Sequence, residues 1–204
     1  MRKINKAIPF FLCLTILGLV SCRPLEETQA STPVPQQNQT ANQLFPVKNN
    51  GKYGYIDQRG TIVITAEFDE AFDFSEGMAK VKIADKFGYI DSTGKTVIAP
   101  QFDDADDFSE GLAGVMTDGK MGFIDKTGQM IISPQFDDAE SFSEGMAEVK
   151  IGEKWGYINK VGEIVISPQF EDSQNFLQGL AAVQVSSKWG YIDKTGKFVW
   201  NPTE

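Results

Sequence analysis

Histidine is absent from all 204 residues, and this absence removes several kinds of chemistry. Without imidazole the chain has no histidine general base, no Ser–His pair and no histidine ligand for a metal ion. Cysteine is nearly absent too, because Cys13 and Cys22 are the only two copies. Both lie in the first 22 residues, so the remainder of the chain has neither a thiol nucleophile nor a disulfide.

Basic residues are scarce relative to acidic ones, with 19 Lys and Arg against 28 Asp and Glu and a net charge of −9. A nucleic-acid partner needs basic groups that displace counterions from phosphates, so this balance argues against one. It argues equally against adhesion to anionic lipid head groups. A long apolar stretch is lacking as well, since the run over residues 7–20 has 14 residues and is too short to span a bilayer comfortably.

The start of the chain is typical of a secretory signal peptide, because Arg2 and Lys3 precede residues 7–20. The apolar run ends in Leu19-Val20-Ser21-Cys22, which resembles the lipobox of bacterial lipoproteins. The resemblance implies that residues 1–21 are a lipoprotein signal peptide and that Cys22 carries the lipid. The alternatives are a plain secretory signal with a chance cysteine and an uncleaved anchor.

A lipid at Cys22 would place the protein on the extracytoplasmic side of a bacterial cell envelope, anchored to the membrane by acyl chains. Arg23 follows the cysteine, which favours the outer membrane in hosts where Asp after the cysteine is the retention signal. Removal of residues 1–21 takes away three basic residues and no acidic one, so the net charge falls from −9 to −12. Residues 22–43 hold the lipidated cysteine and then few apolar groups, a composition that predicts a disordered tether.

The chain after residue 43 is periodic, with a constant step of 34 residues. A step without insertions indicates an array of units that bury one another's faces. Three sets of residues keep the step: Gly54, Gly88, Gly122, Gly156 and Gly190; Gly60, Gly94, Gly128, Gly162 and Gly196; and Ile56, Ile90, Ile124, Ile158 and Ile192.

Each unit is predicted to be β, although helical tetratricopeptide repeats share this period. The units contain fixed glycines and short β-branched or aromatic runs, and no long 3.6-residue pattern. Residues 44–204 therefore predict an all-β domain of five three-stranded antiparallel meanders. Their expected bounds are about 44–68, 78–102, 112–136, 146–170 and 180–202. An open, superhelical, solenoid-like array is the preferred closure, and a closed five-bladed, propeller-like ring is the alternative.

The turns and links of the units have recognisable residues. In "IDKTGK", Asp193 and Gly196 favour a type I turn closed by a left-handed glycine. In the link "QFDDADDFSEG", we expect Asp103 or Asp104 to cap a short helical turn and Gly111 to end it. Two more residues of this link, Phe102 and Phe108, are expected to pack in the core and so to hold the link against it.

The recurring "KWGYIDKTGK", "VISPQF" and "FSEGLAAV" resemble the WG-repeat, or KWG-repeat, family of bacterial secreted and surface proteins. The resemblance covers residues 44–204 and implies an interaction or ligand-binding module. The Trp position departs from the pattern in three units, where it holds Tyr53, Phe87 and Met121. Because Met also occupies this position, core packing is its favoured role. If an aromatic ligand site exists, Trp155 and Trp189 are its expected residues.

Clustered acids recur in the links, as at Asp103, Asp104, Asp106 and Asp107. They fit turn capping and solubility better than calcium binding, because the spacing of an EF-hand loop is absent. A carboxylate pair could act as in a glycosidase, yet acids that recur in every unit argue against a singular catalytic pair.

These features together predict a protein that is not an enzyme, with no catalytic residue, cofactor or metal. We expect a binding or scaffolding lipoprotein of the cell envelope whose partner is an envelope protein or a glycan. A structural spacer is one alternative, and a carbohydrate-active enzyme is another.

Overall fold

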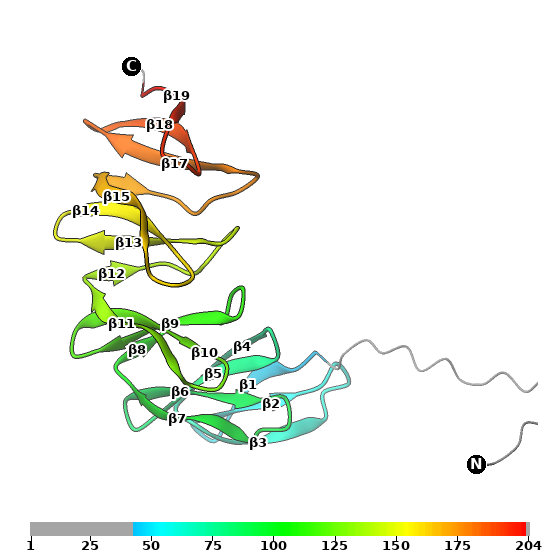
Figure 1. Cartoon of the computed structure of the whole chain (residues 1–204). Coiled ribbons are helices and arrows are strands. Elements are labelled where there is room, and N and C mark those ends of the chain that lie inside the picture. Colours follow the sequence, from blue (N-terminus) through cyan, green and yellow to red (C-terminus); the bar gives the residue numbers. More distant parts are fainter. Residues whose placement is uncertain (1–42, 203–204) are drawn as a thin grey trace, which may run out of the picture. The chain divides into compact units, whose positions relative to one another are not determined.

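The computed structural model describes residues 43–202, which form an all-β array of five antiparallel sheets (Figure 1). The signal peptide, Cys22 and nearly all of the tether predicted by the sequence lie outside the described residues. Within residues 43–202 there is no helix of the length and apolarity needed to cross a bilayer.

The first sheet has three strands and each of the other four sheets has four, always in sequential order. The first sheet contains β1 (Phe45–Asn49), β2 (Lys52–Ile56) and β3 (Ile62–Phe68). The second contains β4 (Glu70–Ser75), β5 (Met78–Ile83), β6 (Lys86–Asp91) and β7 (Thr96–Phe102). The third contains β8 (Asp104–Ala105), β9 (Leu112–Thr117), β10 (Lys120–Asp125) and β11 (Met130–Phe136).

The last two sheets repeat this arrangement. The fourth contains β12 (Asp138–Ala139), β13 (Met146–Ile151), β14 (Lys154–Asn159) and β15 (Ile164–Phe170). The fifth contains β16 (Asp172–Ser173), β17 (Leu180–Val185), β18 (Lys188–Asp193) and β19 (Phe198–Trp200). The five predicted meanders are therefore present, and the fourth strand of sheets two to five is an addition.

This added strand corrects the expected helical turn in the links. Asp104 and Ala105 pair with Met116 and Val115 instead of opening a helix. The left-handed Gly111 is confirmed, with φ of 86°, but it follows Glu110 at φ of 53° in a two-residue hairpin loop. In that loop the N–H of Ser109 donates to the carbonyl of Leu112 at 2.9 Å, and the N–H of Leu112 donates back at 3.1 Å. Two successive positive φ values match a type I′ turn, which suits the twist of β-hairpins.

The "IDKTGK" turns have the predicted conformation. Gly196 has φ of 81°, and its N–H donates to the carbonyl of Asp193 at 2.9 Å. The Asp193 carboxylate accepts further bonds from the N–H groups of Thr195 at 2.9 Å and Lys197 at 3.1 Å. An aspartate at this place therefore holds the loop closed, as the sequence indicated.

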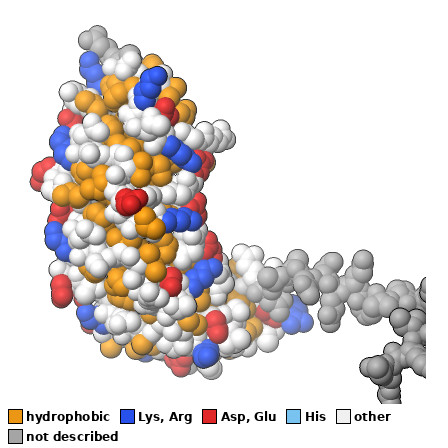
Figure 2. Space-filling model, in the orientation of Figure 1, with side chains coloured by type: hydrophobic (Ala, Val, Ile, Leu, Met, Phe, Trp, Pro, Cys, Tyr) orange, Lys and Arg blue, Asp and Glu red, His pale blue; other side chains and the backbone are white. Residues whose placement is uncertain are grey.

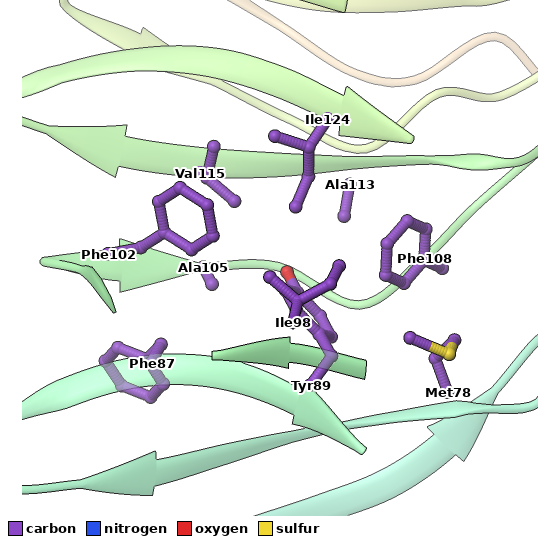
Figure 3. Packing of buried hydrophobic residues seen from close by; sticks show 10 residues of the cluster. All are labelled: Met78, Phe87, Tyr89, Ile98, Phe102, Ala105, Phe108, Ala113, Val115 and Ile124. Atoms are coloured by element: carbon purple, nitrogen blue, oxygen red, sulfur yellow. The ribbon is translucent and has the colours of Figure 1, made fainter. Parts of the chain in front are cut away.

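The hydrophobic core lies between successive sheets, so every interior sheet is buried on both faces. We call the face toward the following sheet the C-side face and the face toward the preceding sheet the N-side face. In the cluster between sheets two and three, the C-side face carries large residues and the N-side face mostly small ones (Figure 3). The C-side residues are Met78, Phe87, Tyr89, Ile98 and Phe102, and the N-side residues are Ala105, Phe108, Ala113, Val115 and Ile124.

The same cluster recurs at the other three interfaces with equivalent residues. Phe102 and Phe108 both lie in the core, as predicted for the link. The first and the fifth sheet share no cluster, and residues 43–202 form an open array instead of a closed ring (Figure 1).

A ladder of polar contacts also joins the second, third and fourth sheets to the sheet that follows each of them. The Glu110 carboxylate accepts from the N–H of Gly145 at 2.9 Å and pairs with Lys160 of the same following unit at 3.0 Å. The pairs Glu76–Lys126 and Glu144–Lys194 repeat this arrangement. The Ser109 hydroxyl adds a bond to the Phe142 carbonyl at 2.7 Å. These bonds fix the register of one sheet on the next.

Candidate functional site

The Trp position of each repeat lies on the second strand of its meander, and in the first four repeats it faces the following sheet. Phe87 and Met121 are buried there, while Tyr53 and Trp155 are half-buried against the same kind of core cluster. Core packing is therefore confirmed for positions 87 and 121. Trp155 differs from them because part of its ring also borders a pocket.

The glycine after the Trp position is required by the fold. A Cβ atom built on Gly156 would lie 2.5 Å from the carbonyl oxygen of Ile166 and 2.6 Å from the nitrogen of Pro168. The β14–β15 pairing is irregular at this point, with a register shift between Trp155 and Tyr157. The glycine thus lets the backbone of the neighbouring strand approach closely, as expected of a strand glycine.

The recurrent acids of the links close turns and pair with lysines. The carboxylate of Asp137 accepts from the Lys120 ammonium at 2.5 Å and from the N–H of Gly152 at 2.6 Å. These two bonds hold the pKa of Asp137 below its usual range. Asp69 and Asp103 are bonded in the same way to Lys52 and Lys86. Residues 43–202 contain no group of three or more carboxylate, cysteine or histidine side chains placed to hold a metal ion.

The pocket beside Trp155 lies between sheets four and five and has a volume of about 290 Å³. Its other lining residues are Glu140, Glu148, Asp172, Ser173, Gln174 and Asn175. One wall is thus an indole ring, and the rest is polar and acidic. We call this cavity the Trp155 pocket.

Glu148 lines the Trp155 pocket and is only 3% exposed. Its Oε2 accepts a hydrogen bond from the Ser173 hydroxyl at 2.5 Å. Its Oε1 lies 3.3 Å from the Asn175 amide nitrogen in the orientation that also satisfies the Ser141 carbonyl. Burial raises the pKa of Glu148 to about 7, Ser173 opposes the rise, and the charges of Glu140 and Asp172 add to it.

The other predicted aromatic, Trp189, is not part of this pocket. It lies on the C-side face of the fifth sheet and is 40% exposed. Tyr191 on the same face is 41% exposed, whereas its counterparts Tyr55, Tyr89 and Tyr157 are covered by the following sheet. Tyr191 packs instead on Trp200, with ring centroids 6.2 Å apart and planes 12° from parallel. The structure therefore separates Trp155 and Trp189 instead of joining them in one site.

A second surface feature recurs in every unit. Just before the buried isoleucine of the last meander strand, or before Trp200 in the fifth unit, an aliphatic side chain faces solvent. Its exposed fraction ranges from 39% to 61%. We call this row the aliphatic stripe; it consists of Val63, Val97, Ile131, Val165 and Val199. Figure 2 shows hydrophobic side chains along much of one face, with acidic and basic side chains between them.

The family model of the WG containing repeat matches residues 53–87, 87–120, 121–155, 155–189 and 189–202. The chain belongs to the WG-repeat family. Each matched segment begins at a Trp position, so the family unit starts on the strand that contributes Tyr53, Phe87, Met121, Trp155 and Trp189. The predicted family is confirmed, while no described residue tests the lipid anchor.

Three solved structures similar to this WG-repeat protein are distant from it. The WD40 β-propeller domain of Doa1 has 11% identity and a TM-score of 0.41 over 77% of this chain, which spans 64% of that chain. A protein of unknown function from Bacteroides caccae has 15% identity and a TM-score of 0.36, over 78% of this chain and 77% of its own. A plant lectin with two metal-binding sites from Cicer arietinum has 13% identity and a TM-score of 0.29, over 63% and 87%. Such weak likenesses carry no argument about function, and no curated protein matches the sequence.

Proposed function

We propose that this WG-repeat protein is a non-catalytic binding or scaffolding lipoprotein of the bacterial cell envelope. The observation that carries the proposal is the aliphatic stripe, which presents one solvent-exposed aliphatic side chain at the same place in all five units. Exposed apolar side chains that align along a surface are typical of interaction sites. A pure spacer, which is the main alternative, has no need of such a row.

Multivalency is the mechanism that this geometry supports. Packed sheets lie roughly 10 Å apart, so the stripe offers equivalent contacts at regular intervals. Each contact is weak by itself, but linked contacts strengthen one another because later ones form at high effective concentration. A repetitive partner, such as a fibrous envelope protein or a glycan chain, would match this spacing best.

The membrane anchor belongs to the same proposal. A lipid at Cys22 and a tether over residues 22–43 would hold the array near the membrane on the extracytoplasmic side, with the outer membrane favoured. The tether would reach roughly 25 Å on average as a flexible chain. The acidic surface supports attachment through acyl chains in preference to attraction by anionic lipids.

The experiment is a pull-down of envelope proteins and glycans with the full-length protein in mild detergent. The test variant replaces Val97, Ile131 and Val165 by Thr, which keeps the branch at Cβ and puts a hydroxyl in place of one apolar branch. The matched control replaces Ile83, Ile151 and Val185, which are equally exposed but lie off the stripe. We expect the stripe variant to lose captured partners and the control to keep them. Equal capture by both variants, or no capture by the wild type, would contradict the proposal.

A carbohydrate-active enzyme remains the second candidate, because Glu148 is a singular acid with a raised pKa. The equivalent positions in the other four units hold Pro46, Lys80, Gly114 and Ala182. Release of sugar from envelope polysaccharide by the wild type and not by Glu148→Gln would favour this candidate over the binding module.

A further inference from the structure

The residue positions that line the Trp155 pocket have equivalents at the other interfaces, and those between sheets two and three show what such a place can hold. There the ammonium of Lys80 donates to the carbonyl of Ala105 at 2.6 Å. The same nitrogen lies 4.4 Å from the ring centroid of Phe72 and 5.7 Å from that of Phe87. Burial raises the pKa of the neighbouring Asp106 to about 6, and the charge of Lys80 opposes this rise. The chain therefore fills this site with its own alkylammonium group.

Two repeats further along, the same positions hold different residues. Glu148 stands where Lys80 stands, Trp155 replaces Phe87, and Ser173 replaces Ala105. The acid at position 104 is kept as Asp172, and Glu140 takes the place of Phe72. The internal cation has thus been exchanged for a carboxylate, while an aromatic wall remains. The result is a cavity of about 290 Å³ with three carboxylates around it.

A lysine beside the Trp155 ring, Lys150, does not take the place of Lys80. The Lys150 ammonium lies 5.7 Å from the ring centroid of Trp155, and its counterpart Lys82 lies 5.1 Å from that of Phe87. Phe87 therefore has two lysines beside it, and Trp155 keeps the equivalent of only one of them. The lysine without an equivalent beside Trp155 is Lys80, because Glu148 occupies its position. The interface between sheets three and four is closed in a third way, because the carboxylate of Asp106 comes within 2.5 Å of the Cβ position of Gly114.

We infer that the Trp155 pocket binds a protonated primary amine on an alkyl stem, supplied by another molecule in the place that Lys80 occupies between sheets two and three. This inference rests on the proposed binding function and names the chemistry that one site of the array recognises. The indole face attracts a cation more strongly than a Phe ring does. Glu140, Glu148 and Asp172 line the cavity, and a cation bound there would favour the deprotonated, charged form of Glu148. The volume lies just below the usual range for small-molecule pockets, about 300–1,000 Å³, so the site suits a single side chain or head group.

The test uses the full-length protein in mild detergent and follows the indole N–H signals of its three tryptophans by NMR. The probe is Nα-acetyl-lysine methylamide, and the matched neutral probe is Nα-acetyl-norleucine methylamide. We expect the lysine probe to shift the Trp155 signal saturably and to leave Trp189 and Trp200 unchanged, while the norleucine probe shifts none. Equal shifts from both probes, or an unshifted Trp155 signal, would overturn the inference.

Two substitutions at one position sharpen the result. Glu148→Gln should weaken binding of the lysine probe at least about fivefold, whereas Glu153→Gln, in the exposed turn before β14, should leave it unchanged. Glu148→Lys should restore the Lys80 arrangement and abolish binding, with unchanged Trp189 and Trp200 signals reporting an intact fold. Wild-type affinity in Glu148→Lys would refute the inference.

A third probe, O-phosphoethanolamine, separates two sources of the amine. Tighter binding of the lysine probe identifies a peptide side chain, and tighter binding of phosphoethanolamine identifies a lipid head group.

The envelope pull-down keeps this inference separate from the proposed function. If the wild type captures partners but binds neither amine, the inference fails and the proposed function stands. If the amines bind but no envelope partner is captured, the inference stands and the proposed function fails.

Discussion

Replacement of Glu148 by Gln should make the protein more stable at high pH and leave its stability nearly unchanged at low pH. The pKa of this buried carboxyl rises from 4.5 to about 7 on folding. A raised pKa means that its stabilising contribution is complete below pH 4.5 and is lost as the pH rises through 7. Gln keeps the shape of the protonated acid and cannot ionise, so it avoids this loss.

The size of the stability difference follows from the pKa shift of Glu148. A rise from 4.5 to about 7 corresponds to roughly 3 kcal/mol at full effect. Because the pocket opens to solvent, which screens the charge, we expect about 1–2 kcal/mol at pH 8. Glu140 and Asp172 face the same cavity in both proteins, so the comparison with wild type largely cancels their direct contributions.

The assay is urea unfolding of the full-length protein in mild detergent, followed by circular dichroism between pH 5 and pH 8. The control is Glu153→Gln, which removes an exposed carboxylate from the turn between β13 and β14. The reasoning would be refuted by a Glu148→Gln difference that is the same at pH 5 and pH 8. It would also be refuted by a wild type that is the more stable protein at pH 8.

Three further predictions concern the backbone, the ladder and the anchor. Gly156→Ala should destabilise the protein by more than about 3 kcal/mol in thermal or urea unfolding, because its Cβ would lie 2.5 Å from a backbone oxygen; a loss under 1 kcal/mol would contradict the close approach. Lys160→Met should cost only about 0.2–1 kcal/mol, since the ion pair with Glu110 is partly exposed, and the cost should shrink in 1 M salt. Cys22→Ser should abolish palmitate labelling and release the protein from membranes, and unchanged membrane association would rule out the lipid anchor.

Most of the fold could be predicted from the sequence because its determinants are local and recur. The glycine after the Trp position, the Asp and Gly of each second turn and the short aromatic runs define three strands per unit. The fourth strand could not be predicted in this way. A two-residue strand such as Asp104–Ala105 has no periodicity of its own and exists only through pairing with Val115 and Met116. The acids of the link therefore resembled a helix cap.

The site was predicted only in part. The rarity of Trp among the repeats singled out Trp155, which lines the pocket, and Trp189, which does not. Glu148 was missed because the repeat pattern marks what stays constant, and its position varies from Lys80 through Gly114 to Ala182. The signal that could have identified Glu148 is a residue that departs from the repeat pattern at a buried position.

The division of each sheet into a face of large residues and a face of mostly small ones has a consequence for how such a protein can change length. Every internal interface joins the same two kinds of face through equivalent residues. Duplication of one 34-residue segment in the gene would therefore insert a sheet whose two new interfaces are already compatible with their neighbours. Each insertion would lengthen the stack by roughly 10 Å, the usual spacing of packed sheets. The reach of the array can thus be altered in fixed increments without redesign of its core.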